Sequence, residues 1–329
     1  MTHLIARRGL MKGALAMAAM TTTSTVLSGA AAGQDATTSL PSNYPGLYSF
    51  SIGEWKAVVL SDGPLDQGDP VKVLKGHSAD EIHQVLRDNF LNENNMSLDQ
   101  NVLLLQAGDR LVLFDTGTGG APLFGDLPGK LISNFERLGI NPHAVTDVIL
   151  THAHPDHIWG MTDQSETEHF PNAQVHIHET DYEFFVDPAN DSHSLLGPFM
   201  PACRRELEIA KGRLNLLKDG QEVLPGITTM FAPGHTPGHT IFGIQSGNKS
   251  MILTADLAHH HAIFTKYPDI QFGFDTDPQQ MVETRSRYFD MIATDRLPFL
   301  SYHFPFPGIG NLERANVGYR WVAAGLDNA

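Results

Sequence analysis

Residues 151–160 read THAHPDHIWG. Three histidines and one aspartate fall within six positions of this stretch, in the spacing H-x-H-x-D-H. Imidazole and carboxylate groups are the usual protein ligands of zinc and of its neighbours in the first transition row. Solvated histidines would need no particular spacing, so the pattern predicts a metal site.

The residues around this stretch predict how the ligands are presented. An apolar run at 145–150 indicates a strand that ends where the ligands begin. In an extended chain His152 and His154 point to the same side. The proline that follows them suits the first turn of a helix, which would carry Asp156 and His157 in another direction. This arrangement predicts two metal ions.

Three more candidate ligands, His235, Asp256 and His303, each follow a short apolar run. With them, the order of ligands along the chain resembles that of the metallo-β-lactamase superfamily, which is H-x-H-x-D-H, then His, Asp and His. The Asp-Thr-Gly turn at 115–117 is similar to one in that family. The resemblance covers nearly the whole chain after its leader, and all seven ligand positions are filled.

The resemblance implies an α+β fold, the metallo-β-lactamase αββα sandwich, in which two mixed sheets pack face to face with helices outside. The order of strands and helices along the chain favours the same architecture. We expect strands at 48–52, 55–60, 102–106, 110–114, 145–150, 174–177, 227–231, 240–244, 251–254 and near Phe299, and helices at 78–89, about 130–138 and about 278–293.

The resemblance also implies how the ligands are shared between two divalent metal ions. One ion would be held by His152, His154 and His235, the other by Asp156, His157 and His303, with Asp256 bridging the two. Zinc is the expected metal, with cobalt or manganese as alternatives. Two such ions can share a hydroxide that attacks the substrate, because coordination lowers the pKa of water. Asp256 is then a candidate proton acceptor.

Within the superfamily the chain looks most like methyl parathion hydrolase and related lactonases and aryl esterases. The segments that carry this likeness are 60–63, 170–173, 306–310 and 318–320. It implies hydrolysis of an ester-type bond in a lactone, an aryl ester or an organophosphate triester. An iron-dependent oxidoreductase of the same fold, similar to persulfide dioxygenases, is the alternative. Such relatives use one iron, and the complete second ligand set argues against them.

Other residues are expected to support the metal ligands or to bind substrate. Asp115 is predicted to accept a hydrogen bond from a ligating imidazole, with a simple turn residue as an equal alternative. His239 is expected to hold its own loop by a hydrogen bond. Candidates for the substrate pocket, all of which could instead be core residues, are Trp159, Phe184, Phe264, Phe272 and His260.

The N-terminal residues have the features of an export signal. Arg7 and Arg8 precede an Ala- and Met-rich stretch and then an A-x-A site. Residues 1–32 therefore resemble a twin-arginine signal peptide, 33–44 a flexible leader, and 45–329 the catalytic domain. The stretch is too polar for a stable membrane anchor. We expect a periplasmic or secreted protein. Cys203 is the only cysteine, so no intrachain disulfide can form.

The charge of the chain limits the substrates that it can attract. The formal net charge is −15, and the predicted signal contains Lys and Arg but no acidic residue, so cleavage makes the charge more negative. Such a field repels nucleic acid. We expect instead a small, uncharged, ester-like substrate with an apolar part. A homodimer is left open.

Overall fold

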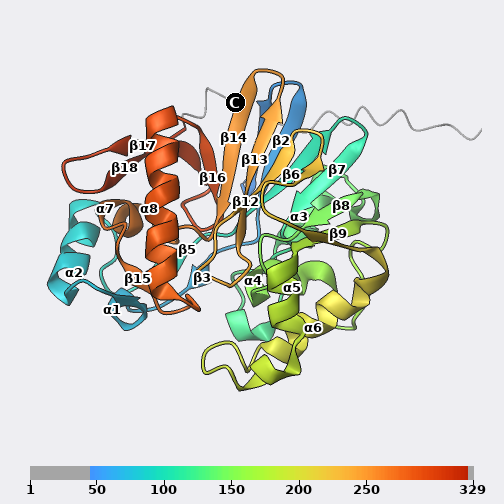
Figure 1. Ribbon diagram of the computed structural model, residues 1–329, viewed down its shortest axis with the longest axis horizontal. Helices are drawn as coiled ribbons and strands as arrows, with labels where there is room; N and C mark the ends of the chain where they lie inside the picture. Colours follow the sequence, from blue (N-terminus) through green and yellow to red (C-terminus); the bar gives the residue numbers. More distant parts are fainter. Residues whose placement is uncertain (1–44, 325–329) are drawn as a thin grey trace, which may run out of the picture. The chain divides into compact units, whose positions relative to one another are not determined.

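Two seven-stranded mixed sheets form the centre of the part of the chain that the computed structural model describes, residues 45–324 (Figure 1). Helices flank both sheets, so the predicted α+β sandwich of the metallo-β-lactamase type is confirmed. The predicted signal peptide at 1–32 and leader at 33–44 lie outside the described residues. The division of the chain into these segments therefore stays a prediction.

The first sheet is antiparallel at one edge and parallel at the other. Its first four strands pair antiparallel, and from the fourth onward the pairs are parallel. In spatial order the strands are β1 (Leu47–Ile52), β2 (Trp55–Ser61), β6 (Asn101–Ala107), β7 (Arg110–Phe114), β8 (Asp147–Ile149), β9 (Gln174–His178) and β10 (Leu214–Leu217).

The second sheet is antiparallel except where β14 pairs with β16. In spatial order its strands are β11 (Glu222–Leu224), β12 (Ile227–Phe231), β13 (Thr240–Ser246), β14 (Lys249–Ala255), β16 (Phe299–Ser301), β17 (Ile309–Arg314) and β18 (Tyr319–Ala323). All the strands expected from the sequence are present in the two sheets.

The alternation of side chains along the strands explains how the sheets pack. In β2, Ala57 and Val59 belong to the apolar layer between the sheets, where they meet side chains such as Phe242 and Leu253 of the second sheet. Val58 points the other way, into the layer under the helices of the first sheet. Because successive side chains of a strand face opposite sides, a sheet covered on both faces has nearly continuous apolar strands.

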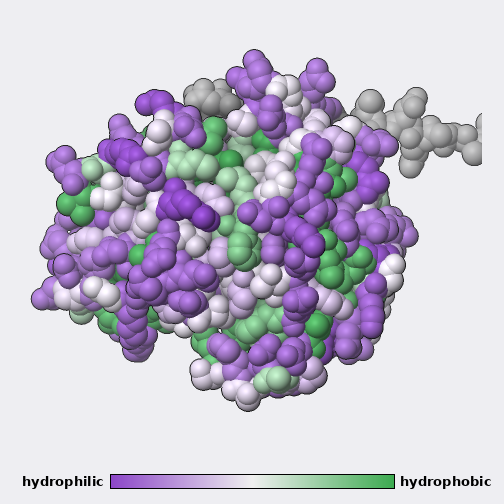
Figure 2. Space-filling model, viewed as in Figure 1, coloured by the Kyte–Doolittle hydropathy of each residue, from purple (hydrophilic) through white to green (hydrophobic). Residues whose placement is uncertain are grey.

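Helices cover the outer faces. On the first sheet, α3 (Leu131–Leu138) packs on β2, and α5 (Glu179–Val186) packs on β9 and β10 beside α6 (Met200–Ile209). On the second sheet, α8 (Pro278–Asp295) packs on β17 (Figure 1). The short helix α7 (His261–Lys266) lies against β18 and α2 (Ala79–Asp88). Between residues 45 and 324 no helix is both long and apolar enough to cross a membrane. On the face drawn in Figure 2, hydrophilic residues surround smaller hydrophobic patches.

The helix boundaries follow signals in the sequence. Ser78 caps α2 and accepts a hydrogen bond from the backbone of Glu81, whose side chain bonds back to the backbone of Ser78. Gly139 ends α3 at φ +68°. The helices α5, α6 and α7 were not predicted. α5 and α7 are short, with eight and six residues, and α6 begins without a capping side chain, so each lacks a strong local helix signal.

Two short strand pairs bring distant segments to the site. β3 (Leu65–Asp66) pairs with β5 (Ser97–Leu98), and β4 (Leu74–Lys75) pairs with β15 (Gln271–Phe272). Between β3 and β4 lies the single helical turn α1 (Pro70–Val73). The first pair joins the segment after β2 to the segment before β6, and the second pair joins it to the segment after α7.

Candidate metal centre

The H-x-H-x-D-H stretch lies where β8 ends, as the sequence predicts. His154 is extended, at φ −66° and ψ 154°, and α4 (Pro155–Ile158) begins at the next residue. The change from strand to helix places His152 and His154 before the helix, and Asp156 and His157 on it. All four side chains are buried except that of Asp156, which is 15% exposed.

The second half of the chain brings three more candidate ligands to the same place. His235 lies in the loop between β12 and β13, Asp256 directly follows β14, and His303 lies two residues after β16. Each is at most 3% exposed. The structure therefore brings together all seven residues that the sequence singled out as metal ligands.

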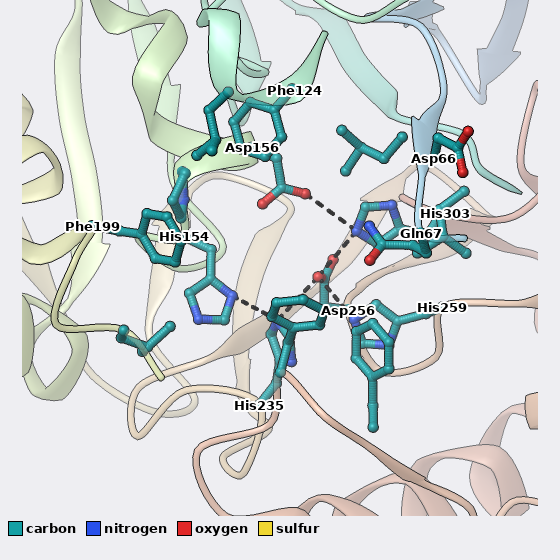
Figure 3. A pocket seen from close by; sticks show the side chains of 17 residues that line it. Asp66, Gln67, Phe124, His154, Asp156, Phe199, His235, Asp256, His259 and His303 are labelled. Carbon is teal, nitrogen blue, oxygen red and sulfur yellow. Dashed lines mark hydrogen bonds and ion pairs between the residues drawn. The ribbon is translucent and has the colours of Figure 1, made fainter. Parts of the chain in front are cut away.

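Asp256 is at the centre of the group (Figure 3). Its Oδ2 lies 3.1 Å from Nε2 of His235 and 3.2 Å from Nε2 of His303, and its Oδ1 lies 3.3 Å from Nε2 of His157. His154 contributes Nδ1, which lies 2.9 Å from Nε2 of His235. These spacings are short enough for neighbouring atoms to bind a common ion, because zinc binds nitrogen and oxygen at about 2.0–2.2 Å.

The structure places the ligand atoms of both expected sets close enough together to hold an ion. One set is His152, His154 and His235, and the other is Asp156, His157 and His303. The buried Nε2 atoms of His152 and His157 and Oδ1 of Asp256 have no hydrogen-bond partner. Leaving a buried polar atom unsatisfied costs about 1–3 kcal/mol. Cations at these positions would satisfy all three, so the residues fit a metal pair.

Hydrogen bonds on the outer nitrogens orient three of the imidazoles. Nδ1 of His235 lies 2.8 Å from Oδ1 of Asp275, and Nδ1 of His303 lies 2.8 Å from the carbonyl oxygen of Asp99. Nδ1 of His157 lies 2.9 Å from Oδ2 of Asp115. A proton on each Nδ1 leaves Nε2 as the lone-pair donor that faces the centre.

Asp115 is more than a turn residue. Its carboxylate also accepts hydrogen bonds from the backbone and the hydroxyl of Thr151, and this hydroxyl lies 3.0 Å from Nδ1 of His152. Its backbone is at φ +63°, a conformation that costs energy for a residue with a Cβ atom. His239 holds its own loop, with Nδ1 2.7 Å from the carbonyl oxygen of Ala232, while Nε2 accepts from the backbone of Asp256.

Burial and neighbouring charges shift the pKa values of the histidines in opposite directions. Burial lowers the pKa of His235, but the hydrogen bonds and charges of Asp256 and Asp275 outweigh it and raise the pKa to about 9 in the metal-free chain. Burial lowers the pKa of His239 to about 4, helped by the charge of His235. The cluster therefore has protons to release when cations bind.

His259 is a member of the cluster that the sequence did not single out. It is 1% exposed, and its Nε2 lies 3.2 Å from Oδ2 of Asp256 without hydrogen-bond geometry. Its Nδ1 has no partner. Burial lowers the pKa of His259 to about 3, so the ring is neutral. In the run His259–His261 the sequence alone does not distinguish the ring that faces the site.

A cavity of about 250 Å³ opens beside the cluster. Phe124 and Phe199 lie on the side of His154 and Asp156, and Gln67 lies on the side of His303 (Figure 3). Apart from the candidate ligands and His259, the polar side chains on its wall are those of Asp66 and Gln67. The rest of the wall is Leu65, Leu98, Leu123, Phe124, Pro155, Leu196, Phe199, Phe272 and Phe274.

Of the five side chains predicted to form the substrate pocket, only Phe272 lines this cavity. Trp159 lies behind the wall, with its ring 5.7 Å from that of Phe124. Phe264 is fully buried behind Phe272, with the ring centroids 6.0 Å apart. These two aromatic residues are near ligands in the sequence, but in the structure they pack behind the wall of the cavity.

The other two side chains are turned away by the helices that carry or follow them. On α5 it is Phe185 that faces His154, at 6.1 Å, so its neighbour Phe184 points toward His193 instead. His260 caps α7, where its Nδ1 accepts a hydrogen bond from the backbone of Ile263. It lines a separate cavity that also contains Asp99.

Comparison with known proteins agrees with this geometry. Residues 97–296 match the family described as the Metallo-beta-lactamase superfamily. The chain belongs to this superfamily.

Curated relatives of this superfamily member include hydrolases and lactonases. The chain is 24% identical over 244 residues to a probable metallo-hydrolase of Mycobacterium bovis, a match that covers 63% of the chain and 69% of that protein. It is 23% identical over 169 residues to an N-acyl homoserine lactonase of Bacillus thuringiensis, covering 51% of the chain and 59% of the lactonase.

Two solved structures of superfamily members are similar over most of the chain. AidC, a dizinc quorum-quenching lactonase in complex with a product, superposes with a TM-score of 0.79 at 28% identity, covering 85% of this chain and 98% of AidC. The hydrolase AbOPH gives a TM-score of 0.79 at 27% identity, covering 86% and 99%.

Proposed function

We propose that this protein is a dinuclear metal-dependent hydrolase that opens lactones carrying an apolar acyl chain. The observation that carries the proposal is the cavity: five of the seven candidate ligands line it, and the rest of its wall is almost entirely apolar. The likeness to a dizinc lactonase supports both the metal pair and the bond class.

We assign the metal ligands as two sets. His152, His154 and His235 would hold one cation and Asp156, His157 and His303 the other, and Asp256 would bridge the two. Zinc is the proposed metal, with cobalt or manganese as alternatives. When bound, such a pair polarises the scissile carbonyl and makes water acidic enough to be deprotonated near neutral pH.

The chain's own residues supply orientation and proton handling. Asp115, Asp275 and the carbonyl of Asp99 keep each imidazole in the tautomer that presents Nε2 to the centre. We propose that Asp256 accepts a proton as the ester bond breaks. His259 is neutral and buried at the cavity wall, so an N–H of its ring can donate to a substrate oxygen.

The wall of the cavity favours an uncharged substrate with an apolar part. Burying an alkyl chain against leucine and phenylalanine side chains contributes about 0.8 kcal/mol per methylene group. A charged group would lose its hydration there without a partner. The net charge of −15 also disfavours polyanions such as nucleic acids.

A second candidate activity is hydrolysis of aryl esters or organophosphate triesters, as in methyl parathion hydrolase. It is favoured by the four phenylalanines of the wall, Phe124, Phe199, Phe272 and Phe274, because aromatic rings stack on an aryl leaving group. An iron-dependent oxidoreductase is less favoured, because both ligand sets are complete.

The test measures metal content and hydrolysis on the same preparations. Elemental analysis of protein purified without added metal should give about two zinc, cobalt or manganese ions per chain. Initial rates of hydrolysis should be highest with an N-acyl homoserine lactone. The Asp256→Ala variant should not hydrolyse this substrate. His143→Ala, which changes an exposed histidine, is the matched control. One iron per chain and no hydrolysis would contradict the proposal.

We also propose that the protein is exported by the twin-arginine route. The full chain should appear in the periplasm without its first residues, and a variant with Arg7→Lys and Arg8→Lys should stay in the cytoplasm. Fractionation of cells followed by N-terminal sequencing measures both. Equal export of the variant would contradict this route.

A further inference from the structure

Asp181 lies on α5, outside the group of candidate ligands, yet it contacts two of the segments that carry them. Its side chain is fully buried. Oδ2 accepts a hydrogen bond of 2.8 Å from the backbone N–H of Ala153, and Oδ1 accepts one of 3.0 Å from the backbone N–H of Gly238. One carboxylate therefore joins two loops that are distant in the sequence.

Both loops carry ligands of the same set. Ala153 lies between His152 and His154, and Gly238 lies three residues after His235. The helix makes a second contact with this set, because the ring of Phe185 lies 6.1 Å from that of His154, edge to face. Within residues 45–324, the hydrogen bonds that the Asp181 carboxylate accepts from backbone N–H groups come from Ala153 and Gly238, and neither of these residues is next to Asp156, His157 or His303 in the sequence.

The glycine at 238 is explained by this contact. A Cβ atom built there would lie 2.2 Å from the backbone nitrogen of Asp181 and 2.5 Å from its Cβ. No side chain can fit between the loop and the first turn of α5. Glycine at position 238 therefore allows the close approach of the loop to α5 as well as the hydrogen bond.

The hydrogen bonds behind the other ligand set do not involve Asp181. His157 bonds to Asp115, and His303 bonds to the carbonyl oxygen of Asp99. Hydrogen-bonding partners behind metal ligands typically change metal affinity by about 10–100-fold when they are removed. A partner that touches only one set should change the affinity of only that set.

We propose that Asp181 is a positioning residue that fixes the spacing between the loop of His152 and His154 and the loop of His235, and so controls the metal affinity of that three-histidine set alone. The inference rests on the proposed metal pair. It concerns a residue that touches neither metal nor substrate and whose backbone partners lie in the loops of one ligand set only.

The test is the Asp181→Asn variant, which keeps the shape of the side chain but turns an NH₂ group toward one of the two backbone N–H donors. Zinc affinities of the metal-free full chain are measured by competition with a chelator. One site should weaken by at least about tenfold and the other by less than about twofold. Anomalous diffraction at the zinc edge then shows which set has lost its ion.

Two further variants separate positioning from loss of folding. Gly238→Ala keeps the carboxylate and disturbs the same contact from the other side, so it should weaken the same site. Asp147→Asn removes another fully buried carboxylate of the first half, bonded to Arg110 and His176 rather than to a ligand loop. It should lower stability and leave both zinc affinities unchanged.

The outcomes distinguish this inference from the proposed function. Equal weakening of both sites, or unchanged affinities in a folded Asp181→Asn protein, would overturn the role of Asp181 while leaving the metal pair intact. Fewer than two bound ions in the unmodified protein would overturn the metal pair itself.

Discussion

At the scale of single residues, the candidate metal ligands could be predicted from the sequence, whereas most of the other residues that line the pocket could not. The four candidate ligands at 152–157 could be named from their spacing and residue types. His235, Asp256 and His303 were named because each follows an apolar run and because the order of ligands resembles that of the superfamily. His259 could not be separated from its neighbour His260, because the direction of each ring depends on where α7 begins. The wall residues Phe124 and Phe199 were missed for a related reason, since they reach the site through tertiary packing.

His259 gives the first prediction at this scale. Replacing it with leucine keeps an apolar wall and removes the N–H that can face a substrate oxygen, so kcat should fall by about 100-fold with two metal ions retained. Steady-state rates and elemental analysis on the same sample measure this. Loss of an ion would instead show that His259 is a ligand, as its place beside His235 and Asp256 would allow.

Asp147 gives a prediction about pH. Burial raises its pKa, but hydrogen bonds from His176, Arg110 and Thr146 outweigh burial and hold the pKa well below its ordinary value. Because the pKa is lower in the folded chain, the stabilisation is present above the unfolded value of about 4 and is lost as pH falls through the folded value.

The Asp147→Asn variant should therefore be less stable by about 2 kcal/mol at pH 7, and the difference should shrink as the pH falls below about 4. Urea denaturation at several pH values measures the difference. Asp109→Asn, which changes an exposed carboxylate in the adjacent turn, should show no such loss. A difference that does not change with pH would contradict the argument.

At the scale of elements, the long strands and capped helices were predictable, because their local signals agree with their tertiary setting. The capping box of α2 and the glycine that ends α3 are examples. The helix α5 was missed because only two of its residues, Asp181 and Phe185, are buried. Its position is set by contacts with the ligand loops, which a local pattern does not contain.

The end of α2 gives a prediction at this scale. Phe90 follows the helix at φ +57° and is 98% exposed, so its ring packs on nothing that would offset the strain. Phe90→Gly should stabilise the protein by about 1 kcal/mol, because glycine adopts this conformation freely. Thermal unfolding measures the gain. Phe90→Ala removes the same ring but keeps a Cβ atom, and a comparable gain from it would contradict the explanation.

At the scale of the whole molecule, the resemblance predicted the sandwich, but not which loops would cover the site. The ligands themselves come from both sheets: His152 to His157 follow β8 of the first, and Asp256 and His303 follow β14 and β16 of the second. A metal pair would therefore link the two sheets at the ends of these strands.

Removal of metal should consequently lower the stability of the whole protein. Ligand present at about 1,000 times its dissociation constant stabilises the folded state by about 4 kcal/mol. A chelator should lower Tm in scanning calorimetry, and added zinc should restore it. The Tm of the Asp256→Ala variant should change much less on addition of chelator or zinc. An unchanged Tm after verified metal removal would contradict a link between the sheets.

The cavity wall has a consequence for how this protein can diverge. Most of its apolar side chains come from segments 65–67, 123–124, 196–199 and 272–274, none of which supplies a candidate ligand. A mutation in one of these segments can reshape the pocket while the ligand sets keep their geometry. Substrate range and metal chemistry can therefore be selected separately, and a library confined to these segments should yield altered specificities without first having to repair the catalytic centre.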